Sequence, residues 1–518
     1  MKKILLLLIM LVIPLICFSF LATTERVSSY EIHLFYDSEL ENRAFIVQKL
    51  MREIENLGYR INVDLFNAAE INSYLISNPG ALYISSRALD SELFLLHRIE
   101  YLDIMVPVVS PSEGVREVRA GQLESLLSGT PSTDDDILKK VARNRIPVGV
   151  ISFNNLNLHV RPIPVDGHFP TISSIKSGEY PWVFRVYLHT RNGNSLVESE
   201  EFRSVCGGGM EHAFTLIAGG DIMLSRGTER FLELYGSQYP FEKIRDEIYK
   251  HDVAFANLES PISSKGTRFQ PNKGIYFRAD PAFIAGLTFG GFDVLSLGNN
   301  HSLDWGVSAL EDTMTLLEDS GIAYSGAGET WDEAFRPAVL DVGGVSVALI
   351  SINDIYPFKV NDATGGSMQT LTYDKHRLAK EIKILREKYD IIIASVHAGV
   401  EYIREPEPSK VEMMRSLINC GVDVVLGSHP HVIQDIEVYG EGLIAYSLGN
   451  LIFDQGWSRS TSLGLLLEVG FLDTRPVYYY PQVVYIQNAQ AHILKNEESR
   501  TIVRYITAEN RGKAYVKN

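Results

Sequence analysis

The chain is poor in cysteine and has no excess of positive charge. Its 518 residues include three cysteines, Cys17, Cys206 and Cys420, and the formal net charge is −16. The cysteine spacing matches no zinc motif, and two free or buried thiols are favoured over a Cys206–Cys420 disulfide. An acidic chain without a local basic stripe repels nucleic-acid phosphates, so we expect no nucleic-acid partner.

Internal repeats are also missing, and the chain has one long uncharged apolar run, at the N-terminus. Lys2 and Lys3 precede a segment from Ile4 to Ala22 that would span roughly 28 Å as a helix, close to the hydrocarbon thickness of a bilayer. This pattern predicts a membrane helix that anchors a single-pass protein in the cell membrane, with its body outside the cytoplasm. The alternative is a signal peptide whose cleavage leaves a secreted or periplasmic protein.

Strand and helix patterns alternate after this run, which is typical of an α/β domain. The predicted strands are the apolar segments 32–36, 61–66, 81–85 and 105–109. The last of these precedes a helix-like segment ending in Ser128-Gly129, and a Gly-x-Tyr-Pro turn follows at 178–181. These pieces resemble the second lobe of phosphate-type periplasmic solute-binding proteins. An unrelated α/β module is the alternative.

A charged stretch that contains three consecutive glycines, Gly207 to Gly209, separates this region from a second α/β region. We therefore divide the chain into five parts. They are the anchor and link at 1–29, an α/β domain at 30–200, a linker at 201–213, the main domain at 214–495, and a C-terminal tail at 496–518.

Six apolar strands of the main domain are followed by polar side chains that bind metals or transfer protons. These residues are Asp221; Asn257 and Glu259; Asn300, His301 and Asp304; His397 and Glu401; His429 and His431; and Asn450 and Asp454. The ends of strands are where α/β folds build their sites. Oxygen and imidazole ligands without cysteine suit manganese, zinc, iron or magnesium, so we predict one or two divalent metal ions.

Each motif alone has a structural alternative. Asp221 fits an ordinary turn, Glu259 a solvated strand end, and His301 a hydrogen-bonded core histidine. Six such strand ends in one domain favour a functional site over six accidents.

The motifs also resemble a known family. They read Asn-Asn-His-x-x-Asp-x-Gly from 299, His-x-Gly-x-Glu-Tyr from 397, Gly-Ser-His-Pro-His from 427 and Ser-Leu-Gly-Asn from 447. This set is similar to the CapA-type family of poly-γ-glutamate capsule biosynthesis, within the calcineurin-like metallophosphoesterase superfamily. The resemblance covers about 214–490 and implies a four-layer αββα sandwich around two facing sheets.

The resemblance implies a role for each residue. One metal would be bound by Asp221 and His431, and the other by Asn300, His397 and His429, with Glu259 in the bridging position. His301 would donate a proton or bind phosphate, and Asn300 and Asp304 belong to the same catalytic motif. Residues that contact substrate or support the ligands would be Asn257, Glu401, Asn450 and Asp454.

One departure from the superfamily pattern stands at Met223, where the first motif usually has a histidine. The first metal is therefore one nitrogen ligand short, unless Asn257 or water fills that place, and is expected to bind more weakly than the second.

Three functions fit these features. The first is a metal-dependent, phosphoesterase-like hydrolase that acts on an anionic polymer or phosphoester in capsule synthesis. The second is a non-catalytic polymer-binding or export component that contacts capsule or polyglutamate synthase subunits. The third is an envelope sensor that binds a solute through residues 30–200.

Overall fold

The computed structural model describes most of the chain from residue 148 onward and shorter stretches before it. The described ranges are 31–37, 50–52, 54–55, 60–66, 82–85, 96–109, 118–119, 134–143, 145–146, 148–191, 210, 212–269, 273–361 and 366–507. Two compact units divide the chain: Met1–Glu100 with Val186–Arg203, and Tyr101–Arg185 with Ser204–Asn518. The predicted domain boundaries stay a prediction.

The predicted membrane helix lies outside the described residues. Among the helices that the structure describes, none is long and apolar enough to cross a membrane. Cys420 is a free, partly buried thiol, whereas the other two cysteines lie outside the described ranges.

The first unit contains a small mixed sheet. Strand β1 pairs in parallel with both β2 and β3, and β3 pairs antiparallel with β7. The strands are β1 (Glu31–Asp37), β2 (Arg60–Phe66), β3 (Leu82–Ser85) and β7 (Val183–Arg191), the last of which begins in the second unit. The α/β pattern predicted for this region is confirmed.

The second unit contains several elements that precede the main domain in the sequence. They are β4 (Leu96–Val109, which begins in the first unit), α6 (Asp134–Ala142), β5 (Gly149–Ser152), η3 (Phe153–Asn155), β6 (Arg161–Pro162) and α7 (Ile172–Lys176). The ring of Phe169 stacks on Tyr480 at 4.6 Å, and the amide of Ile172 donates to the Tyr478 hydroxyl at 2.7 Å. Residues 153–176 therefore belong to the same compact body as the main domain.

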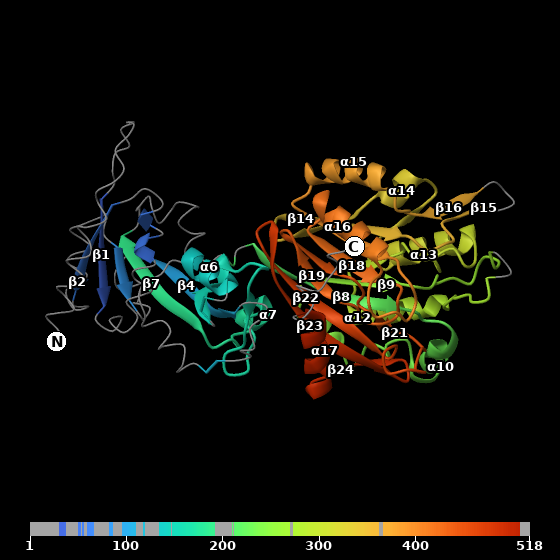
Figure 1. Ribbon diagram of the computed structural model, residues 1–518, viewed down its shortest axis with the longest axis horizontal. Coiled ribbons are helices and arrows are strands. Elements are labelled where there is room, and N and C mark those ends of the chain that lie inside the picture. The colour runs from blue at the N-terminus through green and yellow to red at the C-terminus, as the bar shows by residue number, and fades with distance from the viewer. Residues whose placement is uncertain are drawn as a thin grey trace. The chain divides into compact units, whose positions relative to one another are not determined.

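Two mixed sheets form the centre of the main domain (Figure 1). The first has the order β11-β10-β9-β8-β22-β23-β24, with β21 also paired to β8; the second has the order β13-β14-β17-β18-β20-β19. The first contains β8 (Ala213–Ile222), β9 (Val253–Leu258), β10 (Val294–Ser296), β11 (Ala323–Ser325), β21 (Asn450–Ile452), β22 (Leu463–Leu472), β23 (Arg475–Gln487) and β24 (Gln490–Ile493). The second contains β13 (Ala338–Val342), β14 (Val345–Asn353), β17 (Ile391–His397), β18 (Val424–Ser428), β19 (Ile436–Tyr439) and β20 (Gly442–Ala445). A small third sheet joins β12 (Ala327–Gly328), β16 (Ser367–Thr370) and β15 (Lys359–Asn361).

Each sheet buries both faces, because successive side chains of a strand point to opposite sides. In β17, Ile391 and Ile393 join the core between the sheets, while Ile392 and Ala394 join the core under the helices. The first sheet is covered by α10 (Arg226–Tyr235), α11 (Arg245–Ile248), α12 (Ile284–Gly290) and α13 (Val307–Asp319), and the second by α14 (Trp331–Phe335), α15 (Lys375–Arg386) and α16 (Pro408–Asn419). Helix α17 (Glu497–Thr507) follows the last strand.

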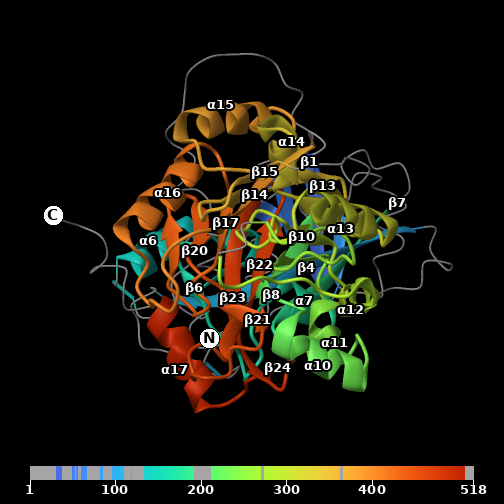
Figure 2. The same cartoon turned by 90° about the vertical axis from the view of Figure 1, so that its right-hand side faces the viewer.

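The layers therefore run helix, sheet, sheet, helix, and Figure 2 shows α15 and α16 on the side opposite α10 and α12. The mixed α/β fold predicted for the main domain is confirmed. Strands β8, β9 and β10 run parallel in one sheet, and β14, β17 and β18 run parallel in the other. Their carboxyl ends carry the predicted motifs.

Candidate metal centre

Strand register aligns the polar residues at the ends of the two sheets. Asp221 in β8 is level with Asn257 in β9 and with Asn450 in β21. In the other sheet, His397 in β17 is level with Ser428 in β18. All of the predicted metal ligands are buried and lie together between these strand ends; they are Asp221, Glu259, Asn300, His397, His429 and His431.

The segment after β18 presents its two histidines through an unusual backbone. His429 has φ 92° and His431 has φ 57°, both in the left-handed region that non-glycine residues seldom adopt. Such strain concentrates at functional sites. Gly427 just before it has no room for a side chain, because a Cβ there would lie 1.8 Å from the carbonyl oxygen of Tyr446.

Short contacts join the predicted ligands in two sets. The Nδ1 of His431 lies 3.3 Å from Oδ2 of Asp221. On the other side, Nε2 of His397 lies 2.8 Å from Oδ1 of Asn300 and 3.2 Å from Nδ1 of His429.

Two groups of three ligand atoms lie close enough together to hold an ion, with all atoms of a group within 4.8 Å of one another. They are Glu259, His429 and His431, and Asp221, Glu259 and His397. Glu259 is common to both groups, which fits a carboxylate between two ions. The assignment of each histidine to one ion stays a prediction.

Glu259 is the most unusual member. Its side chain is fully buried, and neither carboxylate oxygen has a hydrogen-bond donor among the described residues. Its Oε1 faces Nε2 of His431 at 3.7 Å, and Nε2 of His301 and of His397 at 3.9 Å each. Burial, and then the charges of Asp221 and Glu401, hold the pKa of Glu259 well above its usual range.

The histidines are suited to act as neutral ligands. Burial lowers the pKa of both His397 and His429 well below the usual range, and their neighbouring histidines lower it further. A neutral imidazole has a lone pair for a metal. The unpaired carboxylate and the neutral imidazoles therefore fit a divalent cation.

His301 is held by a carboxylate on its far side. Its Nδ1 lies 2.7 Å from Oδ2 of Asp304, and Oδ1 of Asp304 accepts from Lys273 Nζ at 2.5 Å. Lys273 also donates to the carbonyl of Asn300 at 2.7 Å. The ring of Phe277 stacks on His301 at 3.9 Å. His301 therefore turns Nε2 toward Glu259.

Amide side chains support this arrangement. Asn257 donates to Oδ1 of Asp221 at 2.8 Å, and Asn450 lies with Oδ1 3.0 Å from Nδ1 of His431. Asn299 donates to Asn257 and accepts from the amides of His301 and Ser302. Asn299 is not among the predicted site residues, although it stands in the same motif as Asn300. Lys273 is not among them either, because the sequence around it has no comparable signal.

The remaining predicted residues lie farther from the ligand atoms. Glu401 is exposed, and its charge acts on Glu259. Asp454 accepts two hydrogen bonds from Arg226, at 3.0 and 2.5 Å. Met223 is buried with Phe277 and Phe453, so an apolar contact occupies the position where a histidine was expected from the resemblance.

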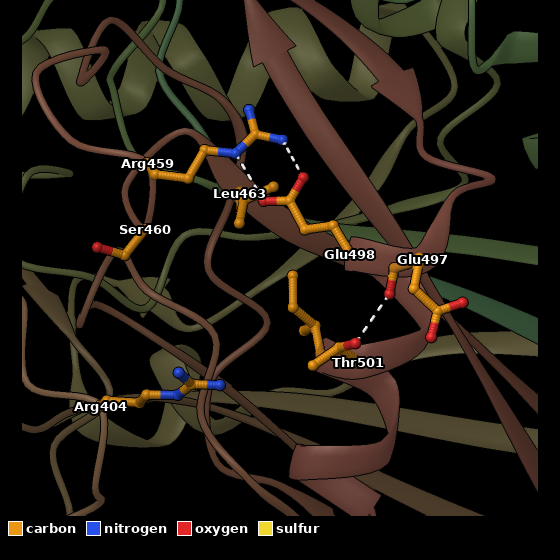
Figure 3. A pocket seen from close by; sticks show the side chains of 8 residues that line it. Arg404, Arg459, Ser460, Leu463, Glu497, Glu498 and Thr501 are labelled. Carbon is orange, nitrogen blue, oxygen red and sulfur yellow. Dashed lines mark hydrogen bonds and ion pairs between the residues drawn. The ribbon is translucent and has the colours of Figure 1, made fainter.

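A separate surface pocket contains none of the predicted site residues (Figure 3). It is lined by Arg404, Arg459, Ser460, Leu463, Glu497, Glu498, Thr501 and Ile502. Two hydrogen bonds, of 2.8 and 2.6 Å, pair Arg459 with Glu498. This pocket is therefore distinct from the candidate metal centre at the ends of the two sheets.

The fold and the site define a mixed α/β domain with a candidate divalent-metal centre between two sheets. Residues 215–455 match the sequence model of the family described as bacterial capsule synthesis protein PGA_cap. Over these residues the chain is similar to that family, which is the CapA-type family that the sequence motifs resemble.

Two similar proteins from Bacillus species are both named CapA. The chain is 30% identical over 258 residues to the capsule biosynthesis protein CapA of Bacillus anthracis, covering 49% of this chain and 62% of that protein. It is 30% identical over 250 residues to the PGA biosynthesis protein CapA of Bacillus subtilis, covering 48% of this chain and 65% of that protein. The chain thus covers less than two thirds of either relative.

A phosphate transport receptor from Vibrio cholerae is among the similar solved structures, with 14% identity and a TM-score of 0.19 over 34% of this chain and 92% of that one. A score this low carries no argument, so the resemblance of residues 30–200 to solute-binding proteins stays a prediction.

Proposed function

We propose that the main domain is a metal-dependent hydrolase of the metallophosphoesterase type, which holds one or two divalent ions. The observation that carries the proposal is Glu259, a fully buried carboxylate without a donor that faces three histidine nitrogens within 3.9 Å. Leaving a buried charge unpaired costs several kcal/mol, by order of magnitude, unless a cation compensates it.

The residues that would hold the ions are Asp221, Glu259, Asn300, His397, His429 and His431. Bound divalent metal would polarise the scissile group and make water a stronger nucleophile at neutral pH. Asn257 keeps the Asp221 carboxylate in place through its 2.8 Å hydrogen bond, and Ser428 lies 2.9 Å from Nδ1 of His397. Both ligands are thus oriented by neighbours on the adjacent strand.

His301 would supply the proton for the leaving group. Asp304 accepts from the Nδ1 side of the ring, so Nε2 is the nitrogen that faces the reacting region. Lys273 holds Asp304 in place through its 2.5 Å hydrogen bond. Phe277 covers one face of the ring and limits access of water.

The names of the two Bacillus relatives, which refer to capsule and PGA biosynthesis, support a substrate class for this chain. We propose that this chain acts in the synthesis of poly-γ-glutamate or a related surface polymer, at the cell envelope. The bond cleaved would lie in an anionic polymer or a phosphoester. Synthase subunits and the membrane are the proposed partners.

A non-catalytic, polymer-binding role is the second candidate. Met223 packs against Phe277 and Phe453 and contributes no nitrogen ligand, which leaves the centre poorer in ligands than a typical phosphatase. Such a centre could bind an anionic chain without cleaving it.

One experiment separates the two functions. The purified full chain is analysed for bound metal and assayed on model phosphodiesters and on γ-glutamyl polymer, with His301→Ala as the comparison. Turnover that is lost in His301→Ala supports the hydrolase, whereas bound metal without turnover supports the binding role. A chain that holds no metal, even after zinc or manganese is added, contradicts both.

A further inference from the structure

Arg226 has a strained backbone close to the candidate centre. It is the first residue of α10 and follows β8 after a short turn, with φ 54°. Left-handed conformation at a non-glycine residue costs roughly 1 kcal/mol or more, so it persists where the surroundings impose it.

Asp454 holds the Arg226 side chain in one orientation. Its carboxylate accepts from Nε of Arg226 at 3.0 Å and from Nη2 at 2.5 Å, and also from the amide of Gly227 at 3.0 Å. These hydrogen bonds leave Nη1 of Arg226 without a recorded acceptor among the described residues. The side chain is 33% exposed, so a ligand can reach it.

The guanidinium lies on an aromatic wall of the centre. Its central carbon is 5.0 Å from the ring centre of Phe277, and the same ring stacks on His301. Phe277 also meets Phe453 edge-on at 5.8 Å, and Phe453 lies 4.7 Å from His431. The guanidinium and the proton donor of the proposed reaction thus both contact the ring of Phe277.

Arg226 differs from the two lysines near the centre in its exposure and in its unused donor. Lys273 is 14% exposed and bonds Asp304 and the Asn300 carbonyl, while Lys410 is fully buried and donates to Gln434. Neither lysine is placed to meet a ligand from solvent. Arg226 is the cation near the centre that combines exposure with an unused donor, within the described part of the chain.

We propose that Arg226 binds an oxyanion of the substrate, a carboxylate or a phosphoryl group, beside the metal centre, and that Asp454 is its positioning residue. A guanidinium suits this task because it offers directed donors to planar or tetrahedral oxyanions. An ordinary surface ion pair would need neither a strained backbone nor a place on the wall of the centre. The inference rests on the proposed function and adds the group that recognises the substrate.

The test uses the metal-loaded full chain and two variants. Arg226→Met removes the guanidinium. Arg377→Met is the matched control, because Arg377 also pairs with an aspartate, Asp332, and lies 3.8 Å over an aromatic ring, Trp331, away from the centre. Binding of inorganic phosphate and of a γ-glutamyl oligomer is measured by calorimetry, and KM and kcat are measured where turnover occurs.

Arg226→Met should weaken binding of one or both probes by about 10- to 100-fold, and KM should rise by more than kcat falls. Arg377→Met should match the wild type. Arg226→Lys should recover part of the affinity, since lysine keeps the positive charge but lacks the paired donors of the guanidinium. Loss of phosphate binding alone identifies a phosphoryl ligand, and loss of oligomer binding alone identifies a carboxylate.

Wild-type affinity in Arg226→Met would overturn the inference, and so would reduced bound metal in that variant, because Arg226 would then support the centre itself. The proposed function is tested separately, because it is contradicted when the wild type binds no metal.

Discussion

Two glutamates are buried in the main domain, and they differ in whether a hydrogen-bond donor meets the carboxylate. Glu468 in β22 is 2% exposed and accepts a hydrogen bond of 2.6 Å from the Tyr478 hydroxyl. Glu259 after β9 is fully buried, and neither of its oxygens has a donor among the described residues. Burial is the largest cause that raises the pKa of both carboxyls.

The difference between them separates a structural role from a functional one. A buried polar group with a structural role has a hydrogen-bond partner, as Glu468 has in the hydroxyl of Tyr478. The neighbours of Glu259 are three histidines and a second carboxylate. These groups stabilise an anion poorly, but they can ligate a cation. The predictions below test this contrast, from the largest expected effect to the smallest.

Glu259→Gln should have the largest effect on activity. Loss of the shared carboxylate should reduce kcat on any substrate that the wild type turns over by at least about 10⁴-fold. The metal-free variant should unfold at the same or a higher temperature than the metal-free wild type, because a neutral amide removes an unpaired buried acid. Turnover assays and calorimetry of chelated protein measure the two results, and a less stable metal-free variant would count against the contrast.

His301→Ala should reduce kcat by about 10³-fold, within the range for removal of a general acid. Bound metal should be unchanged, because His301 is outside both candidate ligand groups. His159→Ala is the control, since the His159 side chain is exposed and its Nε2 lies 3.2 Å from Oε1 of Glu441. Equal kcat for the two variants would remove His301 from the mechanism.

Glu468→Gln should change the pH dependence of stability and leave bound metal unchanged. Burial raises the pKa of Glu468 from about 4.5 to about 7. Between these values the unfolded chain has released the proton that the folded chain still holds, so stability falls as pH rises. The wild type should lose roughly 3 kcal/mol of stability from this group between pH 4.5 and pH 7.

Denaturant unfolding of wild type and Glu468→Gln across this window measures the effect. The free-energy difference between them should shift toward the variant as pH rises. A constant difference would show that Glu468 has an ordinary pKa.

Tyr478→Phe should have the smallest effect, a loss of about 1–2 kcal/mol in the free energy of unfolding at pH 5. The hydroxyl bonds both Glu468 and the amide of Ile172, so its removal leaves both unpaired. Tyr249→Phe, at an exposed tyrosine of the main domain, is the control. Equal stability of the two variants in urea would contradict the role assigned to this hydroxyl.

Much of the site could be predicted because parallel strands bring their ends to one edge. Asp221, His397 and His429 each follow an apolar run, and the six motifs were sufficient to identify them. The contacts made by residues on loops could not be predicted. Lys273 reaches Asp304 from an irregular segment without periodicity, and Arg226 follows the first motif as an ordinary helix-start residue.

The apolar strands of the main domain predicted a mixed α/β fold. Its four layers were expected only from the resemblance to the CapA-type family. The packing of residues 153–176 on β23 could not be predicted from the sequence, because Phe169 and Tyr480 are distant in sequence and share no pattern.

The most direct test of the central claim is the amount of divalent metal bound by chelated and reloaded protein. Mass spectrometry of the metals, after equilibration with manganese or zinc and removal of excess, should find one or two ions per chain in the wild type and in Glu468→Gln. Glu259→Gln should lose at least one of them. Equal metal content in all three proteins, or none in the wild type, would contradict the account of Glu259 as the shared ligand of a metal centre.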